Sequence, residues 1–276
     1  MAVWSAYMRS LILFFLFVTA LWSSERIIAL SPALTEIVFA LGHGDEVVGV
    51  SDYSVYPEAA NLLPKVGGYS QPNLEKIISL NPTLVLTQSY QTTLRAQLEH
   101  FGMETLSLGL VRLEDIKKAI STIALRINAD KNILVQTINR AEQRAKKSEN
   151  DPSVLIVFGG KADLRDGIYI AGHKLFFDDI ITLCGGHNAF TSNFIGQPSL
   201  TMEGVIALNP QIIIVLYSPL TDSAISQENV KKLWSTLPIQ AANNHKIYVL
   251  DALHMHIPSH RVAHTIKDLC EVISDD

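Results

Sequence analysis

The stretch NLEKIISLNPTLVLT (73–87) decides the fold, because the chain repeats its pattern as TMEGVIALNPQIIIV (201–215). Each copy begins with a capping residue, continues as an amphipathic helix that stops at Asn-Pro, and ends in an aliphatic run typical of a buried strand. Helices that alternate with buried strands build parallel sheets. Two copies in distant parts of the chain therefore predict two related α/β lobes.

The sequence around these copies supports the same organisation. Residues 27–50 read as strand, helix and strand, and SVLIVFGG (153–160) restarts the pattern with a new strand. Between them, residues 129–149 form a helical stretch without Gly or Pro, which is either a rigid connector or an ordinary surface helix. We predict an N-terminal lobe at 24–128, a connecting helix at 129–149 and a C-terminal lobe at 150–276, with a ligand cleft between the lobes.

Residues 1–23 are expected to be a cleaved signal peptide. Arg9 is the only charged residue among them, and it precedes the apolar run LILFFLFVTAL (11–21). This run is short for a transmembrane helix, which needs about 20 apolar residues, but it is typical of a secretory signal. The chain is therefore expected to be exported, starting at Met1 or Met8; an uncleaved anchor is the alternative.

Composition and motif content exclude several classes of function. The 276 residues carry a formal net charge of −5, without the basic surface that nucleic-acid binders need. The sequence contains neither an HExxH metalloprotease motif nor a GxSxG nucleophile elbow, so we expect no enzyme activity. Cys184 and Cys270 are the two cysteines of the chain. In an oxidising compartment they are expected to pair, with two buried free thiols as the alternative.

The chain resembles class III periplasmic substrate-binding proteins of ABC importers, the group that captures ferric siderophores, haem and cobalamin. The resemblance rests on the motifs above together with RIIALSPALTEIVFALG (26–42), VVGVSDYSVYP (47–57), LCGGHNAF (183–190) and HKIYVLDA (245–252). It is nearest to the cobalamin-binding proteins. It implies two Rossmann-like lobes with mainly parallel sheets, joined by one long helix that permits little hinge motion. It also implies a disulfide between Cys184 and Cys270.

The resemblance further implies a periplasmic, monomeric protein that has no intrinsic cofactor and delivers its ligand to an ABC permease in the inner membrane. In this family one Glu at the top of each lobe forms a salt bridge with arginines of the permease, and Glu75 and Glu203 match those positions. The alternative role for both is helix stabilisation, because an acidic residue in the first turn interacts favourably with the helix dipole.

The expected ligand site combines aromatic, basic and histidine side chains. Tyr53 and Tyr69 match positions where cobalamin binders place aromatic rings against the corrin, whereas Gln88 and Gln197 replace tryptophans of those proteins. Lys161 and Arg165 follow the strand at 153–160, so they are expected at the cleft edge, where they could neutralise an anionic chelate.

The segment HMHIPSH (254–260) adds metal-binding potential. Imidazole is a good ligand for iron, copper, nickel and zinc, so His254 and His256 are expected to coordinate the metal of a chelate. We therefore predict a ferric siderophore or haem as ligand, with cobalamin as the alternative. A second alternative is a direct metal-ion binder, or an enzyme, built on His254, His256 and His260.

Overall fold

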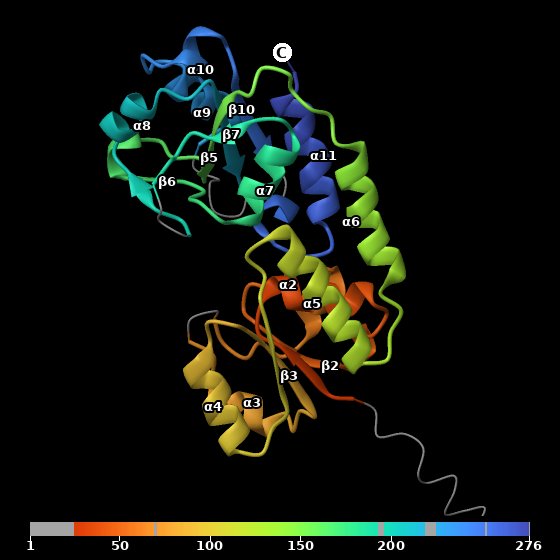
Figure 1. The fold of residues 1–276 in the computed structure, drawn as a ribbon. Helices are drawn as coiled ribbons and strands as arrows, with labels where there is room; N and C mark the ends of the chain where they lie inside the picture. The colour runs from red at the N-terminus through yellow and green to blue at the C-terminus, as the bar shows by residue number, and fades with distance from the viewer. Residues whose placement is uncertain (1–24, 69–70, 193–195, 219–224, 252, 276) are drawn as a thin grey trace, which may run out of the picture.

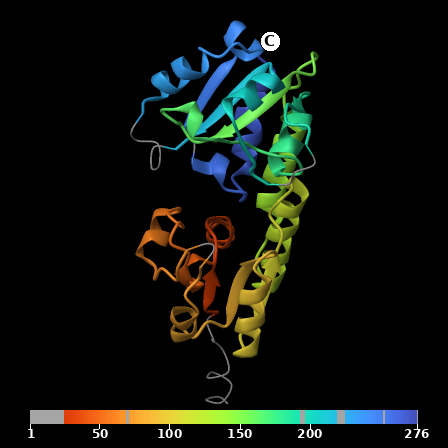
Figure 2. The ribbon, with the colours of Figure 1, turned by 90° about the vertical axis from the view of Figure 1, so that its left-hand side faces the viewer.

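The computed structural model describes residues 25–68, 71–192, 196–218, 225–251 and 253–275. Within these residues the chain forms two lobes, an N-terminal lobe drawn in red to yellow and a C-terminal lobe drawn in green to blue (Figures 1 and 2). The predicted signal peptide at 1–23 lies outside the described residues, and so does Tyr69. No helix of the described part is both long and apolar enough to cross a membrane.

Each lobe is built on a four-stranded parallel sheet. The sheet of the N-terminal lobe has the order β2-β1-β3-β4, with strands β1 (Ile27–Ala29), β2 (Val47–Val50), β3 (Leu84–Gln88) and β4 (Thr105–Leu108). The sheet of the C-terminal lobe has the order β10-β9-β5-β7, with strands β5 (Ser153–Phe158), β7 (His187–Asn188), β9 (Ile212–Tyr217) and β10 (Ile247–Asp251). The predicted α/β fold class with two parallel-sheet lobes is confirmed.

Helices flank the two sheets. Those of the first lobe and the connector are α2 (Pro32–Ala40), α3 (Leu74–Ser79), α4 (Thr92–His100), α5 (Leu113–Arg126) and α6 (Asn132–Arg144). Those of the second lobe are α7 (Phe176–Leu183), α8 (Met202–Leu208), α9 (Gln227–Trp234), α10 (Gln240–Asn243) and α11 (Val262–Ile273). Shorter pieces are the antiparallel pair β6 (Ile168–Tyr169) and β8 (Ser199–Leu200) and the 3₁₀ turns at Gly44–Glu46, Glu58–Leu62, Leu164–Asp166 and Leu253–His256.

The repeated motif forms the same structure in both lobes. Asn73 caps α3 by accepting a hydrogen bond from the backbone N–H of Lys76 (2.9 Å), and Thr201 caps α8 in the same way. After each helix the Asn of Asn-Pro takes a left-handed backbone conformation, with φ of 45° at Asn81 and 46° at Asn209. Asn tolerates this conformation better than most residues, and the following Pro prevents a further helical turn. The chain then enters an inner strand of its sheet, β3 or β9.

The connecting helix is present but shorter than the predicted 129–149. Helix α6 runs from one lobe to the other along one side of the molecule (Figure 1). It begins only after Asp130, whose carboxylate accepts a hydrogen bond from the backbone N–H of Asn132 (2.8 Å). It ends at Ala145, where the backbone turns extended (φ −58°, ψ 125°). Beyond it, the N–H of Ser148 bonds to the carbonyl of Cys184 (2.8 Å), which draws the chain onto the second lobe. The lobe limits of 24–128 and 150–276 stay a prediction.

A disulfide and a shared core tie the elements together. Cys184, which follows α7, is bonded to Cys270 of α11, so the predicted pairing is confirmed and the free-thiol alternative is wrong. Both cysteines are buried in a hydrophobic cluster that continues through Ile138 of α6 into the N-terminal lobe, where it includes Ile37 of α2. Because burial of aliphatic side chains is the main favourable term in folding, this cluster couples the stability of the two lobes.

Candidate functional site

A cavity of about 480 Å³ lies between the lobes, at the edge where the strands of both sheets end. In the first lobe Tyr53 follows β2, Gln88 ends β3 and Tyr90 comes two residues later. In the second lobe Phe158 ends β5 and His256 follows β10. The carboxyl ends of parallel strands are the usual place for ligands in α/β proteins, because the connecting loops meet there. This cavity is therefore the candidate ligand site.

The cavity wall is uncharged and rich in aromatic groups. None of the described residues that line it is Asp, Glu, Lys or Arg. The apolar part includes Leu110, Val111, Phe158, Leu175, Phe176 and Ile257. Hydrogen-bonding groups come from Gln88, Ser89, Gln197, His256 and the two tyrosines. Tyr53 and Tyr90 are 67% and 51% exposed, so both phenol rings are available to a ligand. Such a wall suits a large, flat, mainly apolar molecule.

Tyr53 is held by buried hydroxyl groups beneath its loop. Ser54 lies within 3.0 Å of the hydroxyl of Thr35 on α2 and within 2.8 Å of the hydroxyl of Ser51, and all three side chains are buried. Lys65 donates to the carbonyl of Ser54 (2.7 Å). Because these bonds fix the loop against α2, the phenol ring of Tyr53 projects outward while its backbone is anchored.

A buried ion pair anchors the loop that carries His256. Glu36 of α2 is only 1% exposed, and its carboxylate accepts a 2.9 Å hydrogen bond from Nε of Arg261 in the other lobe. The Arg261 Nη2 and the hydroxyl of Ser259 bond to the same carboxylate. The guanidinium also lies over the ring of Tyr56, 4.1 Å from its centroid. The segment just after His256 is thereby fastened to the N-terminal lobe.

A second ion pair links the lobes at another point. Nε of Arg112, just before α5, donates to both carboxylate oxygens of Asp179 on α7 (2.9 Å each). Asp179 also accepts the backbone N–H of Leu113 (2.9 Å). The Arg112 side chain is 43% exposed, so this pair is more solvated than that of Glu36. Together with α6, the two pairs hold the lobes at three separate places.

Comparison with known proteins places this geometry in a family. The model of the periplasmic binding protein family matches residues 27–253. The chain belongs to the periplasmic binding protein family. It is 31% identical over 255 residues to the vitamin B12-binding protein of Vibrio vulnificus (strain CMCP6). The aligned region covers 90% of this chain and 89% of that protein.

Two solved structures extend the comparison to haem binders. The periplasmic haem-binding protein BhuT in complex with two haems superposes with a TM-score of 0.77 at 26% identity, covering 92% of this chain and 99% of that one. The haem-binding protein RhuT from Roseiflexus sp. RS-1 gives a TM-score of 0.74 at 28% identity, with the same coverage. All three relatives are described as binding proteins, for vitamin B12 or for haem.

The structure brings together only part of the expected site. Tyr53, Gln88 and His256 line the cavity. Lys161 and Arg165 do not: the Lys161 amine bonds to the carbonyl of Asp166 (2.8 Å), and Arg165 pairs with Asp163. The loop after β5 contains its own acceptors for both cations, which draws them away from the cleft.

The three histidines do not form a metal-ion cluster. His254 is outside the cavity lining, and its Nε2 lies 3.1 Å from the carboxylate of Asp268. His254 therefore lies outside this cavity, and its contact with the ligand stays a prediction. Across the described ranges no three His, Cys, Asp or Glu side chains converge as a metal site, and the direct metal-ion alternative stays a prediction. The 3₁₀ turn at Leu253–His256 explains the divergence, because it replaces the extended segment in which both side chains would share one side.

Tyr90 was missed by the sequence reasoning, although a signal for it exists. It follows β3 by two residues, and a parallel strand delivers whatever follows its carboxyl end to the cleft. The same rule would have selected Leu110 after β4 and Phe158 at the end of β5.

Glu75 and Glu203 occupy the first turns of α3 and α8, one in each lobe, and both side chains are exposed. The pKa of Glu203 is lowered because its carboxylate accepts hydrogen bonds from its own backbone N–H and from the hydroxyl of Thr201. Local hydrogen bonds therefore keep the Glu203 carboxylate ionised at its surface position.

We predict that Glu36→Ala destabilises the protein by about 3–5 kcal/mol, because it leaves the buried Arg261 cation without its partner. The matched comparison is Arg112→Ala, which removes half of a partly solvated pair and should cost about 1 kcal/mol. Urea unfolding followed by circular dichroism measures both. Equal losses for the two variants would show that burial does not distinguish these pairs.

We also predict that His260 makes the stability depend on pH. Burial, followed by the nearby Arg261 and His264, lowers the pKa of His260 from 6.5 to about 4. As the pH falls, His260 is protonated in the unfolded chain before it is protonated in the folded protein. Its contribution to the free energy of unfolding is therefore complete above pH 6.5 and is lost as the pH falls toward 4. The slope contributed by one such proton approaches about 1.4 kcal/mol per pH unit. His260→Phe should flatten the curve of unfolding free energy between pH 4.5 and 6.5; an unchanged curve would contradict the assignment.

Proposed function

We propose that this protein is the periplasmic, non-enzymatic binding component of an ABC importer, and that it captures haem as a monomer and delivers it to the permease. The observation that carries the proposal is the composition of the cavity. An imidazole from one lobe and two phenols from the other face a space that is otherwise uncharged and largely apolar. Imidazole and phenolate are both established protein ligands of haem iron.

The absence of charge favours haem over a ferric siderophore. Many ferric siderophores are strongly anionic, and burying such a chelate without a cation would carry a large desolvation cost. No Lys or Arg is among the described residues of the wall, and Lys161 and Arg165 are engaged elsewhere. Haem differs because its charge is confined to two propionates at one edge. Those groups would extend toward solvent while the macrocycle stacks on aromatic rings.

Two relatives support this ligand class. BhuT was solved with two haems bound, and RhuT is a haem-binding protein. Both folds superpose over more than nine-tenths of this chain, which supports a macrocycle as the class of ligand.

Cobalamin is the second candidate, and specific observations favour it too. The vitamin B12-binding protein of Vibrio vulnificus is 31% identical to this chain. The Gln88 and Gln197 amides could bond to the amide side chains of a corrin, and an uncharged wall suits that ligand equally.

We predict that the mature protein binds haem and that binding gives a new Soret band. His256→Ala should lower haem affinity at least tenfold and change this band. The matched control is His254→Ala, since this neighbour pairs with Asp268 outside the cavity. Tyr53→Ala should lower haem affinity about fivefold, or about 1 kcal/mol, because ring stacking is lost. Tyr53→Phe keeps the aromatic ring and should retain most of the affinity. Cobalamin would replace haem as the proposed ligand if calorimetry showed tight cobalamin binding and the haem spectrum of His256→Ala were unchanged.

We also predict that Glu75→Ala combined with Glu203→Ala abolishes ligand uptake by cells while leaving ligand affinity intact. A carboxylate on each lobe supplies two charged hydrogen-bonding points for arginines of a permease. The matched control is Glu114→Ala with Glu228→Ala, which removes two other first-turn acids and the same helix-dipole interactions. Equal loss of uptake in the control pair would assign the effect to helix stability instead of docking.

A further inference from the structure

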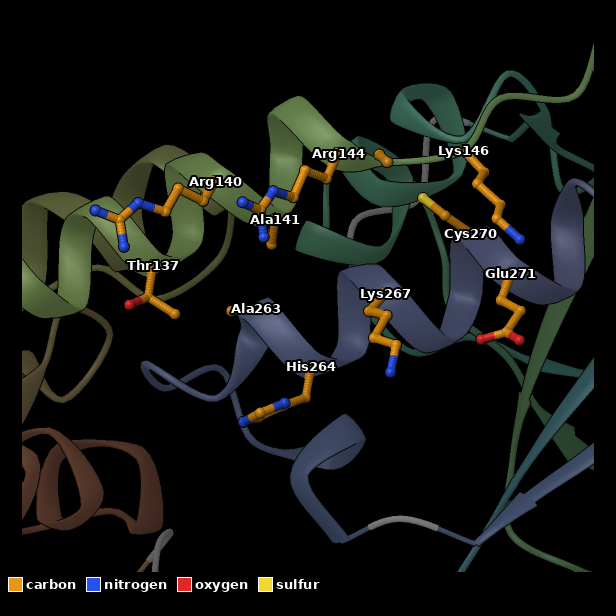
Figure 3. Close-up of a pocket in the computed structure, with 11 residues that line it drawn as sticks. Thr137, Arg140, Ala141, Arg144, Lys146, Ala263, His264, Lys267, Cys270 and Glu271 are labelled. Atoms are coloured by element: carbon orange, nitrogen blue, oxygen red, sulfur yellow. The ribbon is translucent and has the colours of Figure 1, made fainter.

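A larger cavity, of about 700 Å³, lies between α6 and α11. Figure 3 shows α6 on one side of this groove and α11 on the other, with side chains from both helices around it. It shares no lining residue with the cavity between the lobes. Its surroundings therefore call for an explanation separate from the proposed haem site.

The groove is strongly basic on a chain whose formal net charge is −5. Its charged lining consists of Arg140, Arg144, Lys146 and Lys267, with His264 beside them and Glu271 as the acid at one end. Among the ion pairs of the described residues, none involves any of the four Lys and Arg side chains.

Two nearby acids of these helices have partners outside the groove. Glu142 of α6 pairs with Lys117 of α5 (3.1 Å), and Asp268 of α11 lies 3.1 Å from His254. Glu271 is then the one acid among the described lining residues of the groove, against four Lys and Arg side chains.

Helix dipoles explain only part of this arrangement. Arg144 and Lys146 lie at the carboxyl end of α6, where a cation is favourable. Lys267 lies beyond the first turn of α11, where the helix dipole has little effect on a cation. The dipole therefore does not account for the position of Lys267, whereas a bound anion would give this cation a partner.

The floor of the groove is made of small side chains. Ala141 on α6 and Ala263 on α11 are among the residues that line the groove, so long cationic side chains border open space instead of filling it. Cys270 at one end is held by its disulfide to Cys184, which fixes α11 against α7. Exposed cations on two fixed helices around an open volume can converge on a bound anion.

We propose that the groove between α6 and α11 binds a small multivalent oxyanion, one that carries phosphate or several carboxylate groups. Arg140 and Arg144 lie one helical turn apart and supply planar guanidinium groups that match such oxygens in pairs. Lys146 and Lys267 add point charges from the other sides. An occupant would bridge the connecting helix to the last helix of the C-terminal lobe and thereby stiffen that junction.

The test uses pyrophosphate with the full mature chain at constant ionic strength. Calorimetry should show binding, more tightly than inorganic phosphate, and thermal unfolding should shift upward with pyrophosphate concentration. Arg144→Gln combined with Lys267→Gln should lower pyrophosphate affinity at least tenfold while haem affinity stays unchanged. Both substitutions are at exposed positions, and far-UV circular dichroism verifies folding.

The matched control is Lys231→Gln with Lys232→Gln, which removes the same charge from the exposed last turn of α9. Unchanged pyrophosphate affinity in this control supports a defined site. An equal loss in the control overturns the proposal, because the binding would then be nonspecific electrostatic attraction. Absence of pyrophosphate binding overturns it as well. A citrate titration tests whether a ligand with several carboxylate groups also binds. Binding to phosphatidylglycerol vesicles without binding of free pyrophosphate would overturn the small-molecule assignment.

Discussion

The structure depends most on the buried ion pair between Glu36 and Arg261. Its carboxylate is 1% exposed, and its partners come from a different lobe, more than two hundred positions later in the chain. Separating the lobes at this point would strip Glu36 of its hydrogen bonds before water could replace them, and breaking a buried pair costs several kcal/mol. The pair therefore fixes the distance between α2 and the loop that carries His256.

A fixed distance between the lobes changes how the site achieves specificity. Since α6, the Glu36 pair and the Arg112 pair all resist opening, the cavity walls are set before the ligand arrives. A preformed site loses little conformational entropy on binding, so affinity depends on the fit of its aromatic and polar groups. The same pair that holds the lobes also positions the imidazole, because Ser259 and Arg261 follow His256 almost directly. Stability and recognition are thus linked through one carboxylate.

The fold was predictable from the sequence for a physical reason. Capping residues, Asn-Pro stops and aliphatic runs act locally, and the structure has α3-β3 and α8-β9 where these signals occur. The disulfide was predictable through the resemblance to a family, and the structure confirms it. The length of α6 was overestimated because its last turn is decided by a hydrogen bond from Ser148 to the second lobe.

The site was less predictable because it depends on where side chains find partners. Lys161 and Arg165 follow a strand toward the cleft, but the acceptors at Asp163 and Asp166 that capture them are only two to five positions away. Geometry of this kind is invisible to strand and helix patterns. His254 and His256 differ by two positions, yet a 3₁₀ turn sends one to Asp268 and the other to the cavity.

These local pairings give the molecule a consistent distribution of charge. Around the cavity several cations have a local acceptor: Lys161 donates to a backbone carbonyl, Arg165 pairs with Asp163 and Arg261 pairs with Glu36. Glu75 and Glu203 are exposed on helix N-termini, and four Lys and Arg side chains line the groove between α6 and α11. In a low-dielectric cleft an unpaired charge would dominate binding energy and select ligands by charge alone. Under the proposed function, keeping the charges outside would leave ring stacking and metal coordination to decide which macrocycle is retained.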